Sequence, residues 1–137
     1  MLLLDRLLHV DAEMAIAQLT VSRDALFMQD EGMPSWIGLE YMAQAAAAWV
    51  GWHALRENRP VDIGFLLGTR RFEAKCAFFR PGAVLRAHAC RELLGDNGLG
   101  AFDCQLHDEI GGELARARLS VYKPENCTAY VETLRNR

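Results

Sequence analysis

The sequence contains no Cys-x-x-Cys pair, no His at zinc-binding spacing from a Cys, and no long hydrophobic run. Its longest uncharged run, Tyr41 to Leu55, has 15 residues, whereas a membrane-spanning helix needs about 20. Positive charge is not in excess, because 15 Lys and Arg stand against 18 Asp and Glu. These absences exclude a structural zinc site and a membrane-spanning helix and argue against nucleic acid as the main partner; we expect no metal.

The chain has 137 residues, of which 51% are apolar, and neither a linker nor a repeat divides it. We predict a single domain over residues 1–137, in which 124–137 form a short C-terminal tail. The four Cys are expected to be reduced thiols. The apolar start Met1–Leu4 is followed at once by Asp5 and Arg6, so it lacks the core of a signal peptide. We therefore expect a cytoplasmic protein.

Charge is unevenly placed along the chain. Residues 70–91 have a net charge of +5, and the rest of the chain has −8. The stretch is either a docking face for an acidic partner or a solvated strand face. Its charged residues are Arg70, Arg71, Glu73, Lys75, Arg80, Arg86 and Arg91.

Apolar alternation and turn residues predict two strands, one long helix and then a meander of about four strands. The helix is predicted over Trp36–Asn58, with Pro34 and the capping hydroxyl of Ser35 at its start and Pro60 after its end. The strands are predicted over Leu2–Val10, Met14–Val21, Ile63–Cys76 (interrupted at Gly68), Ala83–Leu94, Leu99–Leu106 and Glu113–Tyr122, with a loop over Ser22–Ser35 and turns at Arg80–Gly82, Asn97–Gly98 and Gly111–Gly112.

The predicted helix is apolar on every side. Between Trp36 and Leu55 its strongly polar residues are Glu40, Gln44 and His53. A helix without a polar face is buried all round, which a curved antiparallel sheet wrapped about it would achieve. We predict an α+β fold of this kind with five or six strands. A helix inserted between two subunits is the alternative.

Glu40 is the residue most indicative of chemistry. A buried carboxylate is costly unless it is paired, and Gln44, four residues on, shares its helix face. Burial would raise the pKa of Glu40 toward the range useful for a general acid or base. The amides at the start of the helix could hold a carbonyl oxygen. The alternative is that Glu40 only stabilises the fold.

Four segments resemble the hotdog-fold (3R)-hydroxyacyl acyl-carrier-protein dehydratases, within a likeness that runs from residue 1 to residue 123. The subgroup associated with aryl-polyene gene clusters is the most similar. The segments are the opening strand Met1-Leu2-Leu3-Leu4-Asp5-Arg6, the helix motif Pro34-Ser35-Trp36-Ile37-Gly38-Leu39-Glu40-Tyr41-Met42-Ala43-Gln44, the strand Gly64-Phe65-Leu66-Leu67-Gly68, and the turn Phe79-Arg80-Pro81-Gly82.

The resemblance implies a role for each matched residue. Glu40 would be the catalytic acid and Gln44 its orienting partner. Amides near Ser35 and Trp36 would hold the thioester carbonyl. The acyl group would arrive on the phosphopantetheine arm of an acyl carrier protein, with no cofactor bound by the chain itself, at a site formed across a dimer or higher oligomer. The residues implied to line an acyl tunnel are Gly64, Phe65 and Leu66.

The chain departs from this family in one respect. The usual dehydratase supplies a His from the loop before the helix, and here Ser22–Ser35 contains none. His53 lies 13 residues after Glu40 on the same helix, about 20 Å away at the rise of an α-helix. His88 and His107 fall on predicted strands. The His and Glu pair of the family is therefore incomplete within one chain.

Three functions remain open at this stage. The chain is a dehydratase, acting either without the usual His or with a His contributed by a partner in a heterodimer. Alternatively, it is a thioesterase in which the helix carboxylate activates water, which needs no His. The third possibility is a non-catalytic subunit that stabilises an active partner.

Overall fold

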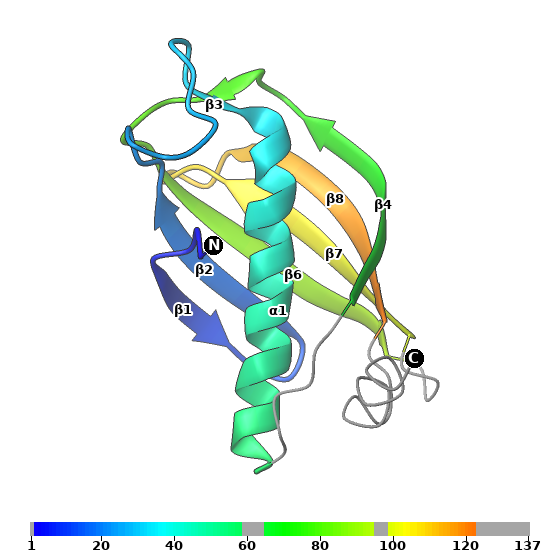
Figure 1. Ribbon diagram of the computed structural model, residues 1–137. Coiled ribbons are helices and arrows are strands. Elements are labelled where there is room, and N and C mark those ends of the chain that lie inside the picture. Colours follow the sequence, from blue (N-terminus) through cyan, green and yellow to red (C-terminus); the bar gives the residue numbers. More distant parts are fainter. Residues whose placement is uncertain (1, 59–64, 95–98, 123–137) are drawn as a thin grey trace, which may run out of the picture.

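A six-stranded antiparallel sheet with a long helix lying across one face forms the described part of the computed structural model (Figure 1). The structure describes residues 2–58, 65–94 and 99–122. The strand order is β1-β2-β6-β7-β8-β4, so β1 and β4 are the two edges. The elements are β1 (Arg6–Val10), β2 (Met14–Thr20), β3 (Met33–Pro34), the 3₁₀ turn η1 (Ser35–Ile37), α1 (Gly38–Arg56), β4 (Phe65–Ala74), β5 (Phe78–Phe79), β6 (Val84–Leu94), β7 (Leu99–His107) and β8 (Glu113–Tyr122).

The α+β architecture with one helix and a sheet of five or six strands is confirmed. Strand β8 has the predicted bounds, and β2, β6 and β7 differ from prediction by one residue at one end. Strand β1 begins at Arg6 rather than Leu2, because the amide of Leu3 donates to a helix side chain instead of a strand. The interruption predicted at Gly68 is a register shift inside a continuous β4. The predicted turn Asn97–Gly98 and the tail 124–137 lie outside the described residues.

The prediction that Ser22–Ser35 is only a loop is wrong. Strand β3 lies inside it and pairs with β5, Met33 opposite Phe79. Gly32, at φ +132°, precedes β3, and a Cβ there would lie 2.4 Å from the carbonyl oxygen of Phe79. Glycine is therefore required where the loop meets the β5 backbone.

The helix starts without the predicted hydroxyl cap. Ser35 begins η1, and no side-chain cap hydrogen bond is made at the start of either η1 or α1. Pro34 stands before η1 at φ −55°, which suits the chain entering a helical turn. The helix therefore lies where the sequence predicted it, but the Ser35 hydroxyl does not cap it.

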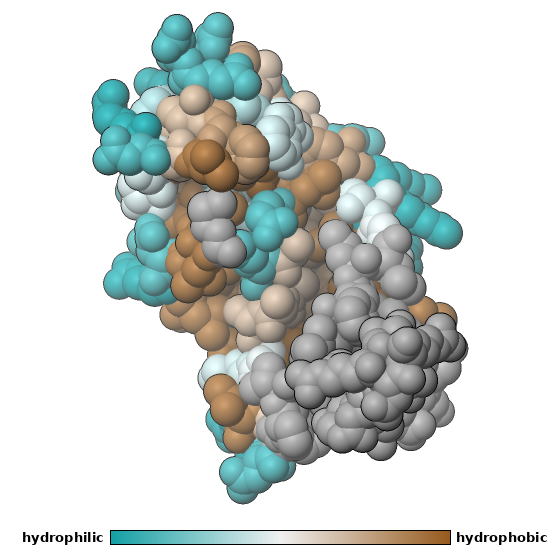
Figure 2. Space-filling model, in the orientation of Figure 1, coloured by the Kyte–Doolittle hydropathy of each residue, from teal (hydrophilic) through white to brown (hydrophobic). Residues whose placement is uncertain are grey.

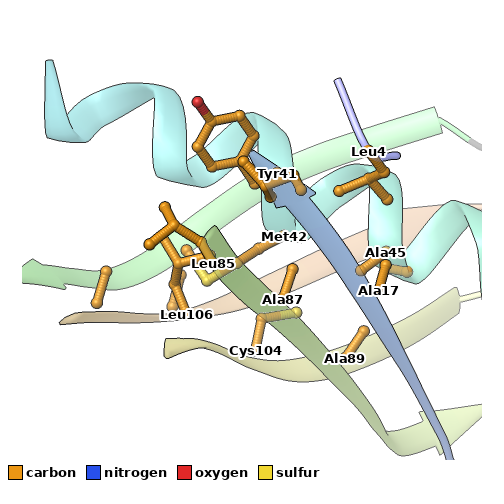
Figure 3. Close-up of a cluster of buried hydrophobic side chains, with 14 of the residues drawn as sticks. Leu4, Ala17, Tyr41, Met42, Ala45, Leu85, Ala87, Ala89, Cys104 and Leu106 are labelled. Atoms are coloured by element: carbon orange, nitrogen blue, oxygen red, sulfur yellow. The ribbon is translucent and has the colours of Figure 1, made fainter. Parts of the chain in front are cut away.

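The core lies between α1 and the inner face of the sheet. Small residues on both sides let the two approach closely, as expected from the alanine-rich helix, and Figure 3 shows Ala17 near Ala45 and Leu4 beside them. Every second residue is buried over 15–19 of β2, 85–89 of β6, 102–106 of β7 and 115–119 of β8, so the alternation predicted from the sequence is confirmed there. The core includes Ala15, Ala17, Leu19, Leu85, Ala87, Ala89, Phe102, Cys104, Leu106, Ala115, Ala117 and Leu119 on these strands and Tyr41, Met42, Ala45, Ala46 and Trp49 on α1.

The prediction that the helix is buried all round is wrong for the single chain. Glu40 and Ala47 are exposed, and Leu55 is 68% exposed. The sheet covers only one side of α1, because its strands curve beside the helix without closing over it (Figure 1). Figure 2 shows hydrophobic residues on the uncovered face, between β1 and α1. The apolar surface left on α1 is consistent with the alternative of a helix placed between subunits.

No helix in the described parts of the chain has both the length and the apolar character that crossing a bilayer requires.

Candidate active site

Glu40 and Gln44 lie on the uncovered face of α1 and are hydrogen-bonded to each other. Gln44 Nε2 donates to Glu40 Oε1 at 3.2 Å, and Gln44 Oε1 accepts from the backbone amide of Leu3 at 2.8 Å. The helical spacing of four residues brings the two side chains together, as predicted. Gln44 thereby connects Glu40 to the N-terminal segment, a contact that sequence reasoning missed because its donor is a backbone group.

Glu40 is exposed in the single chain, so the predicted burial of this carboxylate is not found. The sheet covers the opposite side of α1, which carries the buried residues Tyr41, Met42 and Ala45, and it leaves the side of Glu40 open. The carboxylate is thus accessible to a bound molecule or to a second subunit.

The first helical turn offers fewer free amides than expected. The amide of Ser35 donates to the carbonyl oxygen of Ala77 at 2.9 Å, which holds β3 and the start of η1 against the segment before β5. The amide of Gly38 donates within the turn, to Ser35 and Trp36. Of the two amides implied by the resemblance, that of Trp36 is left to hold a thioester carbonyl.

An exposed apolar patch lies at the same end of the helix and consists of Leu26, Phe27 and Trp36. They are 63%, 50% and 53% exposed, and the rings of Phe27 and Trp36 meet edge to face with centroids 5.3 Å apart. Phe27 has a positive φ of 75°, a strained conformation for a bulky residue. Sequence reasoning named only Trp36 of this patch. The available signal for Leu26 and Phe27 was the presence of large apolar residues in a predicted loop that also contains Gly32 and Pro34.

The described surface has a cavity beside Gln44 and another far from it. One of about 380 Å³ adjoins Gln44, between the N-terminal segment and α1. The other, of about 570 Å³, lies between the turn at Pro81–Gly82 and the turn at Asp108–Ile110, and its lining includes neither Glu40 nor Gln44. The cavity beside Gln44 is lined by Leu2, Leu4, Asp5, Arg6, Leu7, Ala17, Gln44, Ala47 and Ala48.

Two of the residues implied to line an acyl tunnel, Phe65 and Leu66, lie away from the cavity beside Gln44. Phe65 and Leu66 begin β4, where their backbones pair with Tyr122 and Val121 of β8. Gly64 lies outside the described residues. Strand β4 is the sheet edge opposite β1, so these positions and the cavity beside Gln44 belong to different sides of the helix.

None of the four His reaches Glu40. His9 Nε2 is 2.8 Å from Asp11 Oδ2, and His53 Nε2 is 2.8 Å from the Asp11 carbonyl oxygen. His88 on β6 and His107 on β7 place their ring centroids 4.3 Å apart. The family's His and Glu pair is therefore not formed within this chain.

The basic stretch 70–91 does not form one surface. Lys75 Nζ lies 3.4 Å from Glu113 Oε2, and the Arg91 guanidinium lies 5.9 Å from the centre of the Trp49 ring. Arg86 is opposite His107 in the middle of the sheet. This dispersal favours the solvated strand face over a single docking face.

The described Cys, His, Asp and Glu side chains form no second reactive centre. Cys76, Cys90 and Cys104 are free thiols, and burial raises the pKa of the Cys104 thiol far above its ordinary value. Within residues 2–58, 65–94 and 99–122, no three His, Cys, Asp or Glu side chains converge as metal ligands.

The fold and the helix-borne carboxylate define a hotdog-fold protein, and the similar structures confirm that class. Residues 1–132 match the family described as "ApeP-like: ApeP dehydratase", and the chain belongs to this family. The resemblance to dehydratase-like hotdog proteins of aryl-polyene clusters is thereby confirmed.

Solved structures support the same assignment. The chain is 30% identical to a protein in "The Dehydratase Heterocomplex ApeI:P from Xenorhabdus doucetiae", with a TM-score of 0.85 over 99% of this chain and 90% of that one. It is 15% identical to AziG of S. sahachiroi (TM-score 0.69, 87% and 90% covered), a likeness that shows the fold alone. The same holds for a hypothetical thioesterase of Streptococcus pneumoniae TIGR4 with coenzyme A, 11% identical at a TM-score of 0.68 over 86% and 84%. No curated protein matches the chain in sequence.

Proposed function

We propose that this chain is one subunit of a two-subunit dehydratase that removes water from a 3-hydroxyacyl thioester, with Glu40 as the acid. Membership of the ApeP-like family and the similarity to a chain of a dehydratase heterocomplex support a dehydratase-like function. The proposal adds the substrate, the role of Glu40 and the need for a second, His-bearing hotdog subunit.

The observation that carries the proposal is the half-complete site. Glu40 is exposed and oriented by Gln44, while His9, His53 and His107 bond to groups away from it. A carboxyl group positioned in this way can donate a proton to a leaving hydroxyl, but the elimination also needs a base. A base from another subunit would complete the site.

The elimination proceeds by breaking the C2–H and C3–O bonds of the acyl chain and forming a C2=C3 double bond. The His of the partner subunit takes the proton from C2, and protonated Glu40 gives its proton to the C3 hydroxyl, which leaves as water. The amide of Trp36 donates to the thioester carbonyl oxygen and stabilises the negative charge that develops there. The proton on the His then returns to Glu40 through solvent.

The second subunit would cover the apolar patch of Leu26, Phe27 and Trp36. Exposed apolar groups of this size next to a polar site are typical of surfaces that bind another protein. A heterodimer fits the relative that is described as a heterocomplex. A homodimer would bring together two copies of Glu40 and no His from the loop.

The thioester would arrive on the phosphopantetheine arm of an acyl carrier protein, and the chain would bind no cofactor of its own. Both reaction steps are proton transfers, which side chains can carry out without a metal or redox group. We place the protein in the cytoplasm, where thiols such as those of Cys76, Cys90 and Cys104 stay reduced.

The test follows the mass of an intact 3-hydroxyacyl carrier protein. The chain alone should leave the mass unchanged, and the chain with a His-bearing hotdog subunit should remove one water. E40Q in the complex should lower the rate at least about 100-fold, as loss of a general acid does. E109Q, at the exposed turn after β7, should leave the rate unchanged.

Two outcomes would overturn the proposal. An E40Q complex as fast as the native complex would remove Glu40 from the reaction. Release of the free carrier thiol without loss of water would identify a thioesterase, the function that a helix carboxylate activating water would give.

A further inference from the structure

A group of nitrogen-rich side chains lies on the face of the sheet that is turned away from α1. Arg86 and His88 on β6 and His107 on β7 alternate with the core residues Ala87 and Leu106, so they project from this outer face. The register places His107 directly opposite Arg86. The two imidazole rings have their centroids 4.3 Å apart. These three half-buried side chains, the outer-face cluster, are separated from Glu40 by the sheet, since α1 lies across its other face (Figure 1).

Arg86 brings an unsatisfied donor to the outer-face cluster. Its Nε atom is buried and has no hydrogen-bond partner among the described residues. Buried donors without an acceptor are destabilising, and native proteins contain few of them. A guanidinium group presents its N–H groups as a planar fork that matches two oxygens of an oxyanion. An oxyanion is therefore the acceptor that best suits this side chain.

Gln105 fixes the protonation pattern of His107. Gln105 Oε1 lies 2.8 Å from His107 Nε2. An amide oxygen can only accept, so Nε2 carries the proton of the neutral ring and Nδ1 carries a lone pair. When His107 takes up a second proton, Nδ1–H becomes a new donor and the hydrogen bond to Gln105 is kept. The ring can thus gain a charge-assisted hydrogen bond to an anion without losing its own partner.

The cations of the cluster act on one another. Burial, followed by the proximity of His107 and Arg86, lowers the pKa of His88 below 6.5. A negative charge bound among the three side chains would offset this repulsion and favour the protonated rings. Proton uptake by the imidazoles and anion binding should therefore strengthen each other.

The carboxylates near the cluster are engaged by other cations. Glu113 is opposite His107 but lies 2.8 Å from the Arg116 guanidinium, and among the described residues no carboxylate forms an ion pair with Arg86. On β2, the residues opposite the cluster are the uncharged Ile16 and Gln18. The other charged and titratable groups at adjoining positions are Arg6 and His9 on β1, Cys90 and Glu92 on β6, Asp103 on β7 and Arg118 on β8, where Arg118 and Glu92 are ion-paired at 3.0 Å.

We propose that Arg86, His88 and His107 form a binding site for a tetrahedral oxyanion of the phosphate or sulfate type. Donors from two adjacent strands surround one position on the outer face, and they differ in kind, with a fixed positive charge on Arg86 and titratable charges on the two imidazoles. A free phosphate ion and the phosphate group of a larger ester present the same chemistry to these donors. The site is independent of the reaction at Glu40.

The four His of the native chain provide a test that needs no variant. Sodium sulfate is added against sodium chloride of equal ionic strength, and the imidazole C–H signals are followed by NMR. The signals of His88 and His107 should shift, whereas those of His9 and His53, which bond to Asp11, should not. Sulfate keeps its charge near neutral pH, so any pH dependence comes from the protein. Sulfate affinity should rise about tenfold from about pH 8 to about pH 6, because protonated imidazoles donate charge-assisted hydrogen bonds.

Matched variants separate the site from the general effect of charge. Arg86→Gln should weaken sulfate binding about tenfold or more, through loss of the charged donor. Arg70→Gln removes the same charge at an exposed position of β4, which β7 and β8 separate from β6, and should leave binding unchanged. H107Q should lose most of the pH dependence of binding. Circular dichroism verifies that each variant folds.

Two further probes distinguish the sources of the anion. Inorganic phosphate and ribose 5-phosphate should both displace sulfate; similar affinities would assign the site to the free ion, and tighter binding of ribose 5-phosphate would assign it to a phosphate ester. Equal shifts of all four His signals would overturn the proposal, and so would sulfate binding of the same strength in R86Q and in the native chain.

Discussion

Gln44 links Glu40 to the backbone of Leu3, with its amide nitrogen 3.2 Å from Glu40 Oε1 and its oxygen 2.8 Å from the Leu3 amide nitrogen. One side chain thus orients the carboxylate and anchors the segment that forms the wall of the adjoining cavity. The two functions use different atoms of the same amide group, so substitutions can separate them.

Gln44→Glu keeps an oxygen that accepts from Leu3 and removes the donor to Glu40. We expect the N-terminal segment to stay anchored and kcat of the complex to fall about tenfold, equivalent to about 1.4 kcal/mol. Two carboxylates four residues apart on a helix also repel each other. Steady-state kinetics measure the fall, which should appear in kcat and in the pH profile rather than in KM.

Gln44→Ala is the companion variant, because it removes both hydrogen bonds. Its free energy of unfolding should fall by about 1 kcal/mol relative to the native chain, through loss of the contact to Leu3. Urea unfolding measures this fall. If Q44E had native kcat, the orienting role of Gln44 would be wrong.

Asp11 should make stability depend on pH in the acid range. Hydrogen bonds from His9, Glu13 and Met14 lower the pKa of Asp11 from 3.8 to about 2. A carboxyl group with a lowered folded-state pKa contributes stability above its unfolded pKa, and the contribution is lost as pH falls through 3.8 toward 2. We expect D11N to be less stable at neutral pH and to lose less stability over that acid range. Urea unfolding at several pH values checks this, with the exposed Asp24→Asn as control.

His88 should also make stability decline as pH falls, but in a higher pH range than Asp11. Burial, followed by the proximity of His107 and Arg86, lowers the pKa of His88 below 6.5. As pH falls below 6.5, the unfolded chain takes up a proton that the folded chain resists, so stability declines. H88Q should therefore lose less stability than the native chain when pH is lowered from neutral. Thermal unfolding curves that decline equally for both proteins would contradict this.

Ala87 should tolerate no larger side chain. It is fully buried on β6, on the sheet face that packs against α1 (Figure 3). Ala87→Leu should lower the free energy of unfolding by about 1–3 kcal/mol, because the added carbons force the helix and sheet apart. Ala74→Leu, at an exposed position of β4, should change it by less than about 0.5 kcal/mol. Equal stability of the two variants in urea would show that the helix–sheet packing is not tight there.

Local patterns account for the parts of the fold that sequence predicted. Strand β8 follows Glu113–Tyr122 as predicted, since alternating alanines and arginines allow only one face to be buried. The helix was found because a long uncharged segment lies between Pro34 and Pro60. Strands β3 and β5 were not found, because two-residue strands carry no detectable period and pair only through the folded chain.

The sequence alone placed Glu40 and Gln44 on one helix face and showed that the loop Ser22–Ser35 has no His, and its α+β order of elements together with the likeness to dehydratases predicted the hotdog architecture. Helical periodicity states which residues share a face, but not what covers that face. The folded chain, and no local pattern, establishes that the sheet covers the side of Met42 and leaves Glu40 exposed, and that Leu3 contacts Gln44 across 41 positions. These depend on where a single curved sheet places its strands, which is a property of long-range packing and not of any local pattern.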